Sequence, residues 1–191
     1  MKDKFIEIFK RNVKRDGADT LLEWLEYKSD FFEAPASTRF HGAYKGGLCE
    51  HSVNVYNCLL KSSFVNTNPE TFAIVSLLHD ICKTNFYKTE MRNIKNKETG
   101  VWEQQPYYTI EDKFPYGHGE KSVYIISEFM KLTSEEATAI RWHMGAFDDS
   151  VKGGSFALSG AFEKYPLALE LHIADMRATY HLESDKGKNE L

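Results

Sequence analysis

Apolar side chains recur along most of the chain at the three- and four-residue spacing that places them on one face of a helix. In chain order, the clearest stripes are Phe5, Ile6 and Phe9; Leu21, Leu22 and Leu25; and Val53, Tyr56, Leu60 and Phe64. Each stripe indicates a short amphipathic helix whose apolar face packs into a core. The sequence therefore predicts an all-α fold.

Local signals indicate where several helices begin and where the last one ends. Residues 68–70 (Asn-Pro-Glu) supply an N-cap side chain, then a proline and an acid in the first turn. Thr133 and Glu136 form a capping-box pattern ahead of another apolar stripe. A proline can open a last helix over residues 166–182, and the polar residues 183–191 predict a frayed tail.

One segment departs from the helical pattern. Residues 86–110 combine aromatic and β-branched side chains with a polar stretch, Asn-Lys-Glu-Thr-Gly, at 96–100. This composition favours a small β-hairpin or an irregular excursion near 86–110 over a helix. No interior linker divides the chain, and 191 residues with 42% hydrophobic content suit one core. We therefore expect a single domain over residues 1–191.

Composition and charge limit the classes of function. The formal net charge of −4 argues against an extended surface for nucleic acid, although a few cations could hold a small anionic substrate. The sequence predicts no membrane span and no signal peptide. Cys49, Cys58 and Cys82 form no CxxC pair, so neither a disulfide framework nor a thiolate zinc site is expected. We expect a cytoplasmic protein, and interpret Cys49 and Cys82 as small core residues.

His79 and Asp80 end an apolar run, and imidazole and carboxylate are common ligands for zinc, iron and manganese. Alone, this pair favours the simpler interpretation of a helix-end histidine beside an acid. Four other segments, however, also place a histidine or aspartate at an apolar or glycine-bordered position: His51, His118, His143 and Asp175. Buried aspartate is rare unless it is paired or binds a metal. Helices that converge on one point are the usual way for an all-α core to build a metal site.

This order of histidines and aspartates, with its flanking residues, resembles the HD-domain metal-dependent phosphohydrolase superfamily, and most of all its two-metal members. The segments that carry the resemblance are HGAYKGGLCEHSVNVY (41–56), LLHDICK (77–83), GHGEKS (117–122), IRWHM (140–144) and HIADM (172–176). The first segment is also similar to the HD domain of bacterial 3′-5′ exoribonucleases. The resemblance implies an HD-type helical bundle with its core at about 40–182.

The resemblance also implies a binuclear metal centre. The first divalent ion would be bound by His51, His79, Asp80 and Asp175. Asp80 would bridge to a second ion, which His118 and His143 would also hold. Iron, manganese, zinc, nickel and magnesium are all open as the metal. Two such ions can lower the pKa of a bridging water to about 7, and the resulting hydroxide would attack phosphorus.

Three residues are candidates for contact with substrate. Lys83 follows Asp80 by three residues on the same helix face and could neutralise a substrate phosphate or pair with Asp80. The resemblance places Lys83 near the reacting phosphate, so we assign it a catalytic role together with Asp80. Lys45 could bind phosphate or be a solvated loop lysine. His172 precedes Asp175 by three residues and could touch substrate, orient Asp175 or be structural.

Four further residues are less informative. His41 could line a pocket or simply pack, and His181 is expected on the surface. Phe147 and Asp148 closely follow His143 and are expected on the substrate side.

The resemblance implies a phosphohydrolase whose partner is a small phosphorylated substrate, most readily a nucleotide. Two other functions stay open. Some HD-fold enzymes use the same six-ligand order as a di-iron oxygenase, and a catalytically silent nucleotide-binding module could retain a metal without turnover. The complete ligand set argues against the silent module.

Overall fold

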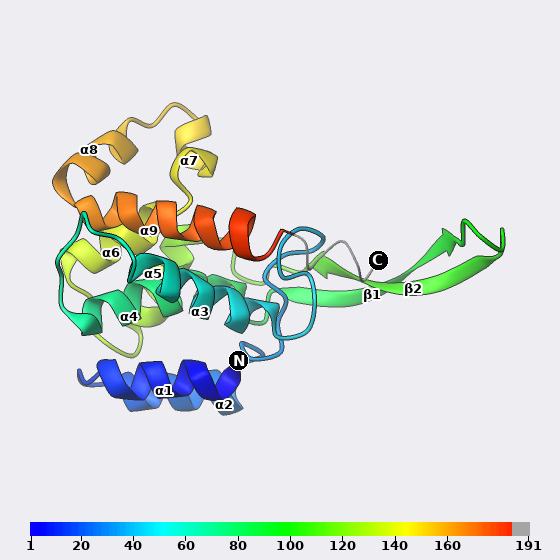
Figure 1. The fold of residues 1–191 in the computed structure, drawn as a ribbon, viewed down its shortest axis with the longest axis horizontal. Helices are drawn as coiled ribbons and strands as arrows, with labels where there is room; N and C mark the ends of the chain where they lie inside the picture. Colours follow the sequence, from blue (N-terminus) through cyan, green and yellow to red (C-terminus); the bar gives the residue numbers. More distant parts are fainter. Residues whose placement is uncertain (185–191) are drawn as a thin grey trace.

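The computed structural model describes residues 1–184 and contains a helical body with one projecting β-hairpin (Figure 1). The helices are α1 (Lys2–Asn12), α2 (Ala18–Tyr27), α3 (Gly47–Leu59), α4 (Pro69–Leu78), α5 (His118–Ser127), α6 (Ser134–Trp142), α7 (Asp149–Lys152), α8 (Ala157–Lys164) and α9 (Pro166–Arg177). The strands are β1 (Tyr87–Lys95) and β2 (Trp102–Ile110). The predicted fold class, all-α with a small hairpin, is therefore confirmed.

The centre of the body is formed by α3, α4, α6 and α9, with α3 packed against both α4 and α9. In Figure 1, α1 and α2 lie along one side of this centre, and α7 and α8 along the other. One continuous cluster of buried apolar side chains runs from Phe5 in α1 to Ala178 after α9. Within residues 1–184, no helix combines the length and apolar character that a membrane crossing requires.

The predicted helix starts are confirmed. The Asn68 side chain accepts a hydrogen bond from the backbone N–H of Thr71 at 2.7 Å, and α4 begins at the next residue, Pro69. Thr133 and Glu136 form a complete capping box at the start of α6. These signals are reliable because each depends on side chains only a few residues from the backbone groups that they satisfy.

The helix predicted from the apolar stripe that begins at Val53 is correct only as far as Leu59, where α3 ends. Beyond that point Leu60 is half exposed and Phe64 is 82% exposed, so the predicted extension of the helix is wrong. Ser62 provides the physical reason. Its hydroxyl accepts a hydrogen bond from the backbone N–H of Phe64 and donates one to Glu170, which stabilises a turn in place of another helical turn.

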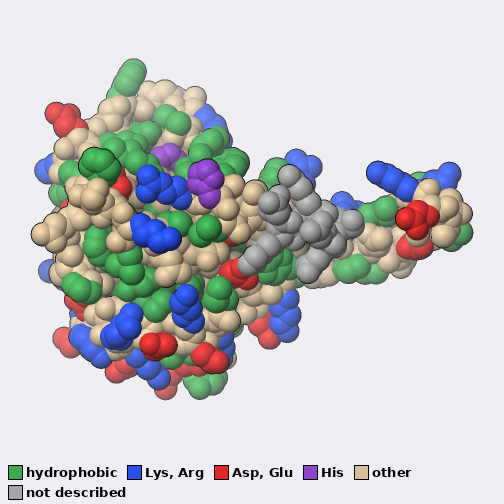
Figure 2. All heavy atoms as spheres, viewed as in Figure 1, with side chains coloured by type: hydrophobic (Ala, Val, Ile, Leu, Met, Phe, Trp, Pro, Cys, Tyr) green, Lys and Arg blue, Asp and Glu red, His purple; other side chains and the backbone are tan. Residues whose placement is uncertain are grey.

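The hairpin pairs β1 and β2 antiparallel, with Tyr87 opposite Ile110 at its base and Lys95 opposite Trp102 near its tip. The Asn96 side chain stabilises the connecting turn, because it accepts hydrogen bonds from the backbone N–H groups of Glu98 and Thr99. The arm projects away from the helices (Figure 1), and Figure 2 shows basic and acidic side chains mixed at its tip. On the face seen in Figure 2, the cations do not gather into one stripe.

The last helix begins at Pro166, as predicted, and continues into a π-helical turn at Ala178–Leu182. The prediction of a frayed tail is wrong for Glu183, which is only 1% exposed. Its burial follows from hydrogen bonds to side chains of α3. The polar composition of the tail does not indicate these long-range contacts. Residues 185–191 of the predicted tail lie outside the described residues.

Candidate metal centre

The six histidine and aspartate candidates come from five segments and meet at one place. His51 lies in the second turn of α3, His79 and Asp80 follow α4, His118 begins α5, His143 follows α6, and Asp175 lies near the end of α9. His51, His79, Asp80 and His143 are almost completely buried. Helix ends that face the same point thus bring together residues up to 124 positions apart in the chain.

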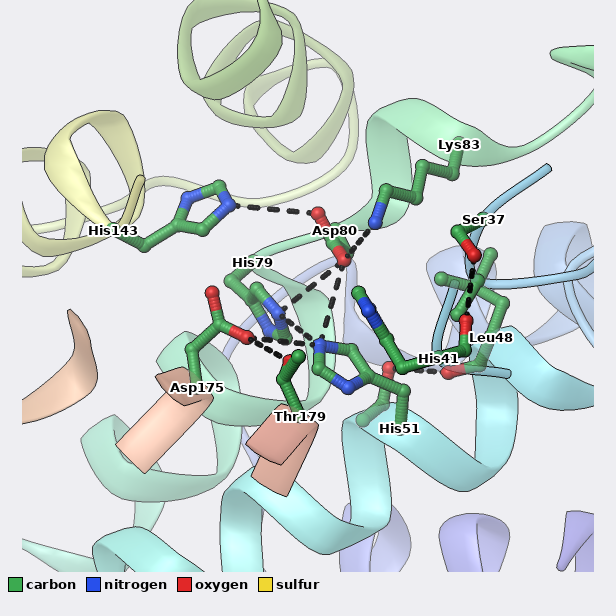
Figure 3. A network of polar contacts seen from close by, with 12 residues as sticks. Ser37, His41, Leu48, His51, His79, Asp80, Lys83, His143, Asp175 and Thr179 are labelled. Atoms are coloured by element: carbon green, nitrogen blue, oxygen red, sulfur yellow. Dashed lines mark hydrogen bonds and ion pairs between the residues drawn. The ribbon is translucent and has the colours of Figure 1, made fainter. Parts of the chain in front are cut away.

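The carboxylate of Asp80 lies at the centre of the group (Figure 3). Its Oδ1 atom lies 2.8 Å from Nε2 of His118 and 3.4 Å from Nε2 of His143. Its Oδ2 atom lies 3.5 Å from Nε2 of His79 and 3.6 Å from Nε2 of His51. The two oxygens of one carboxylate therefore face two different pairs of imidazoles.

Asp175 completes the first of these two groups. Its Oδ1 atom lies 3.2 Å from Nε2 of His51, and Thr179 donates a hydrogen bond to the same oxygen. The Nε2 atoms of His51 and His79 are 3.2 Å apart. Two sets of three close ligand atoms could hold a metal ion here: His51, His79 and Asp80, and His79, His143 and Asp175.

Two of the histidines are held in the tautomer that a metal ligand needs. Nδ1 of His79 donates to the carbonyl oxygen of Ser76 at 2.8 Å, and Nδ1 of His143 donates to that of Ile140 at 2.7 Å. Both rings therefore direct an Nε2 lone pair toward Asp80. Among the described residues, the buried Nε2 of His143 has no hydrogen-bond partner. A buried nitrogen without a partner is costly unless something else binds it.

Burial and charge act differently on the imidazoles. Burial lowers the pKa of His79 to about 3, so this ring is neutral. Burial also opposes protonation of His51, but its hydrogen bonds to Asp175 and Glu183 raise its pKa to about 10. For Asp80, burial favours the neutral acid, yet Lys83 and the surrounding imidazoles keep its pKa well below the usual range. The ionised carboxylates thus attract positive charge to this point.

Two contacts in the centre were not predicted from the sequence. Glu183 lies 3.0 Å from Nδ1 of His51. Cys82, interpreted as a core residue, is buried, but its sulfur also lies 3.4 Å from Nδ1 of His118. Cys82 follows Asp80 by two residues, so its position in the sequence could have indicated a contact with the centre. No feature of the sequence around Glu183 indicated such a contact.

A model of the HD-domain family matches residues 48–178, which is more than half of the chain. The chain belongs to the HD-domain family. No curated protein and no solved structure matches it. Membership indicates a metal-dependent hydrolase, and the buried histidine and aspartate cluster of this HD domain is able to bind metal.

Lys83 of this HD domain lies inside the centre, with its ammonium 2.7 Å from Oδ2 of Asp80. Burial opposes its charge, but Asp80 raises the pKa of Lys83 above its ordinary value, so the side chain is a cation. Lys45 lies elsewhere. It is paired with Glu33 at 3.0 Å, its side chain is 71% exposed, and it does not line the cavity described next. The structure therefore favours the alternative of a solvated loop lysine.

A cavity of about 740 Å³ opens over Asp80, Lys83 and Asp175. Its other cations are Arg39 and Lys152. Its aromatic side chains are Phe40, His41, Tyr87, His118, Phe147, His172 and Tyr180. The volume lies within the range of small-molecule sites, about 300–1,000 Å³.

His172 lines this cavity and also supports a ligand, because its Nδ1 donates to the carbonyl oxygen of His143 at 2.7 Å. Gly145 makes this approach possible: a Cβ atom there would lie 2.5 Å from the His172 ring. The hydrogen bond fixes the Nδ1–H tautomer of His172.

Of the remaining candidates, His41 and Phe147 line the cavity, whereas Asp148 and His181 do not. The ring of His41 lines the cavity 4.9 Å from that of His51, and burial lowers its pKa to about 4. Phe147 also lines the cavity, but Asp148 does not. Asp148 is instead buried against Arg141 at 2.7 Å and caps α7, so its expected place on the substrate side is wrong. His181 is exposed, as expected.

Proposed function

We propose that this HD domain is a phosphohydrolase that uses two divalent ions to cleave a phosphate ester of a nucleotide or another small molecule. The observation that carries the proposal is the placement of Asp80. Each of its two oxygens faces a separate pair of imidazole Nε2 atoms, at 2.8 to 3.6 Å. This is the arrangement expected of a carboxylate that bridges two ions.

The residues present suit such a group. The rings of His79 and His143 already donate through Nδ1, so each has an Nε2 lone pair available for a cation. A cation would also satisfy the buried Nε2 of His143, which has no hydrogen-bond partner among the described residues. The first ion would be held by His51, His79, Asp80 and Asp175, and the second by Asp80, His118 and His143. Four imidazoles favour iron, zinc or nickel over magnesium, which prefers oxygen ligands, and the two carboxylates also suit manganese.

When bound, the ions would supply a water of lowered pKa as nucleophile and positive charge to offset the phosphoryl oxygens. The protein's own residues supply the rest. The Lys83 ammonium lines the cavity beside Asp80, where it can attract and orient a phosphate. His172 lines the same cavity, and its bond to His143 leaves Nε2 free to accept a hydrogen bond from substrate.

The cavity supports a nucleotide as the substrate. Phe40, Phe147 and Tyr180 line it and are more than half exposed, so their rings are available to stack on a planar base. Arg39 and Lys152 add positive charge beyond that of Lys83. We also propose that the chain acts as a single domain, which the shared core from Phe5 to Ala178 supports.

The test combines metal analysis with a substrate panel. Protein purified without chelator would be assayed for bound metal and incubated with nucleotides, phosphodiesters and sugar phosphates. Asp80→Asn is expected to lose metal, and hydrolysis is expected to fall by about 100-fold or more. The ions would supply the positive charge at the phosphoryl oxygens, and losing one such electrostatic contribution costs about 10²–10³ in rate. Asp148→Asn is the matched control, since Asp148 is also buried but pairs with Arg141.

Three outcomes would contradict the proposal. Asp80→Asn could retain both metals and full hydrolysis. The protein could instead take up oxygen with an iron pair bound, as a di-iron oxygenase would. Finally, it could hold a nucleotide unchanged for hours with metals present, as a silent binding module would.

A further inference from the structure

The chain beyond α9 contacts the metal centre, although all of it after Ala178 lies outside the segment that the HD-domain model matches, residues 48–178. The helix widens there into a π-helical turn, Ala178–Leu182, and π-helical turns occur often at functional sites. Thr179 in this turn donates to Asp175, and the turn delivers Glu183 to the interior.

Glu183 is held by two donors from α3, on the side of His51 away from Asp80. Its Oε2 atom lies 3.0 Å from Nδ1 of His51, and its Oε1 atom accepts a hydrogen bond from the Asn54 amide at 2.8 Å. The side chain is 1% exposed. A carboxylate buried this deeply is therefore aimed at one imidazole nitrogen and fixed in place by a second contact.

We propose that Glu183 is a positioning residue of the metal centre, which accepts the Nδ1 proton of His51 and so directs the Nε2 lone pair of that ring to the first ion. The inference rests on the proposed metal centre. Histidine ligands commonly donate their second N–H to a carboxylate or carbonyl, which fixes the tautomer and raises the basicity of the ring.

The three buried histidines are not equivalent in this respect. His79 and His143 donate to backbone carbonyls, which are neutral, whereas His51 has a carboxylate partner. Of these three rings, His51 is therefore the one whose second nitrogen faces a negative charge. The metal group that includes His51, His79 and Asp175 gains most from Glu183, and the group at His118 and His143 gains least.

A structural role is the alternative, in which Glu183 merely fastens the end of the chain to α3. The two roles predict different results. A fastening contact lowers the stability of the protein whether or not metal is present. A positioning contact lowers the affinity for metal, because the His51 ring and its tautomer are no longer held.

The experiment measures Mn²⁺ affinity by titration calorimetry of metal-depleted protein, together with melting temperatures in chelator. Glu183→Gln leaves one acceptor oxygen for two donors, and it is expected to weaken binding at the tighter site by about 10- to 100-fold. Glu170→Gln is the matched control. Glu170 is also a buried glutamate near the C-terminal end, but it accepts from Ser62. The control is expected to leave Mn²⁺ affinity unchanged.

Unchanged Mn²⁺ affinity in Glu183→Gln would overturn the inference and leave the proposed function standing. So would an equal loss of affinity in Glu170→Gln. If the wild-type protein bound no Mn²⁺ and no other divalent metal, the proposed function and the inference would both fail. Should Glu183→Gln not fold, Asn54→Ala takes its place. This variant removes one of the two contacts that hold Glu183, and a severalfold loss of affinity is expected, while no loss would contradict the proposal.

Discussion

The Arg15 cluster and the metal centre both bury charged side chains between helices, but they differ in how their polar atoms are satisfied. The Arg15 cluster consists of Arg15, Glu70, Thr71 and Glu136. Glu136 is fully buried, and both of its oxygens accept hydrogen bonds from the Arg15 guanidinium, at 2.8 and 2.9 Å. Thr71 donates to Glu136, and Glu70 also pairs with Arg15. Donors and acceptors match.

In the metal centre, one buried acceptor has no donor among the described residues. The Nε2 lone pair of His143 faces the Oδ1 atom of Asp80, another acceptor, at 3.4 Å. In the neutral His143 ring, the single proton lies on Nδ1, where the backbone carbonyl of Ile140 accepts it. A buried cluster that satisfies itself stabilises the fold, whereas one whose fixed acceptors face one another fits a cation. This difference separates a cluster that is satisfied within the protein from one that is able to bind metal.

The largest expected effect comes from breaking the matched cluster. Arg15→Ala leaves the buried Glu136 carboxylate without its cation, and the free energy of unfolding is expected to fall by about 3–5 kcal/mol. Urea denaturation measures this. Metal affinity of the folded variant is expected to stay at the wild-type value, because Arg15 contacts none of the proposed ligands. A loss below about 1 kcal/mol would show that this cluster contributes little.

A smaller effect is expected from pH. Burial alone would raise the pKa of Glu136, but the hydrogen bonds from Arg15 and its neighbours lower it below the ordinary 4.5. Glu136 therefore contributes stability that is present above pH 4.5 and is lost as pH falls through its folded-state pKa. Unfolding free energies measured in chelator between pH 5 and pH 3 are expected to fall more steeply for wild type than for Glu136→Gln. Equal slopes would contradict the assignment.

The smallest effect on stability is expected at the metal centre itself. His143→Leu removes one hydrogen bond to Ile140, but it also removes the buried Nε2 that lacks a partner. These changes offset each other, so stability in chelator is expected to change by no more than about 1 kcal/mol. The same variant is expected to lose the second ion, as metal analysis would show. A loss of 3 kcal/mol or more would place His143 with the structural cluster.

The elements that could be predicted from the sequence depend on neighbours in the chain. Asn68 caps α4 and Thr133 caps α6 because each acts on backbone groups three residues away. The helix predicted to extend to Phe64 was wrong, because the spacing of apolar residues carries no information about the hydrogen bonds of Ser62. One of these bonds joins Ser62 to Glu170, which is distant in the sequence.

The site shows the same division. His79 and Asp80 stand out locally. The other four ligand candidates stand at apolar or glycine-bordered positions, and the resemblance to a known family assigned their roles. Lys45 fits a motif equally well, yet the structure pairs it with Glu33 away from the cavity. Glu183 escaped notice because 132 positions separate it from His51, and the polar residues around it resemble a solvated end.

The central claim is that the Asp80 carboxylate lies between two ions. Anomalous diffraction from crystals grown with Mn²⁺ tests it most directly. Two peaks are expected on opposite sides of Asp80, one bordered by His51, His79 and Asp175, and the other by His118 and His143. A single peak that Asp80 does not touch, or no peak among these six residues, would contradict it.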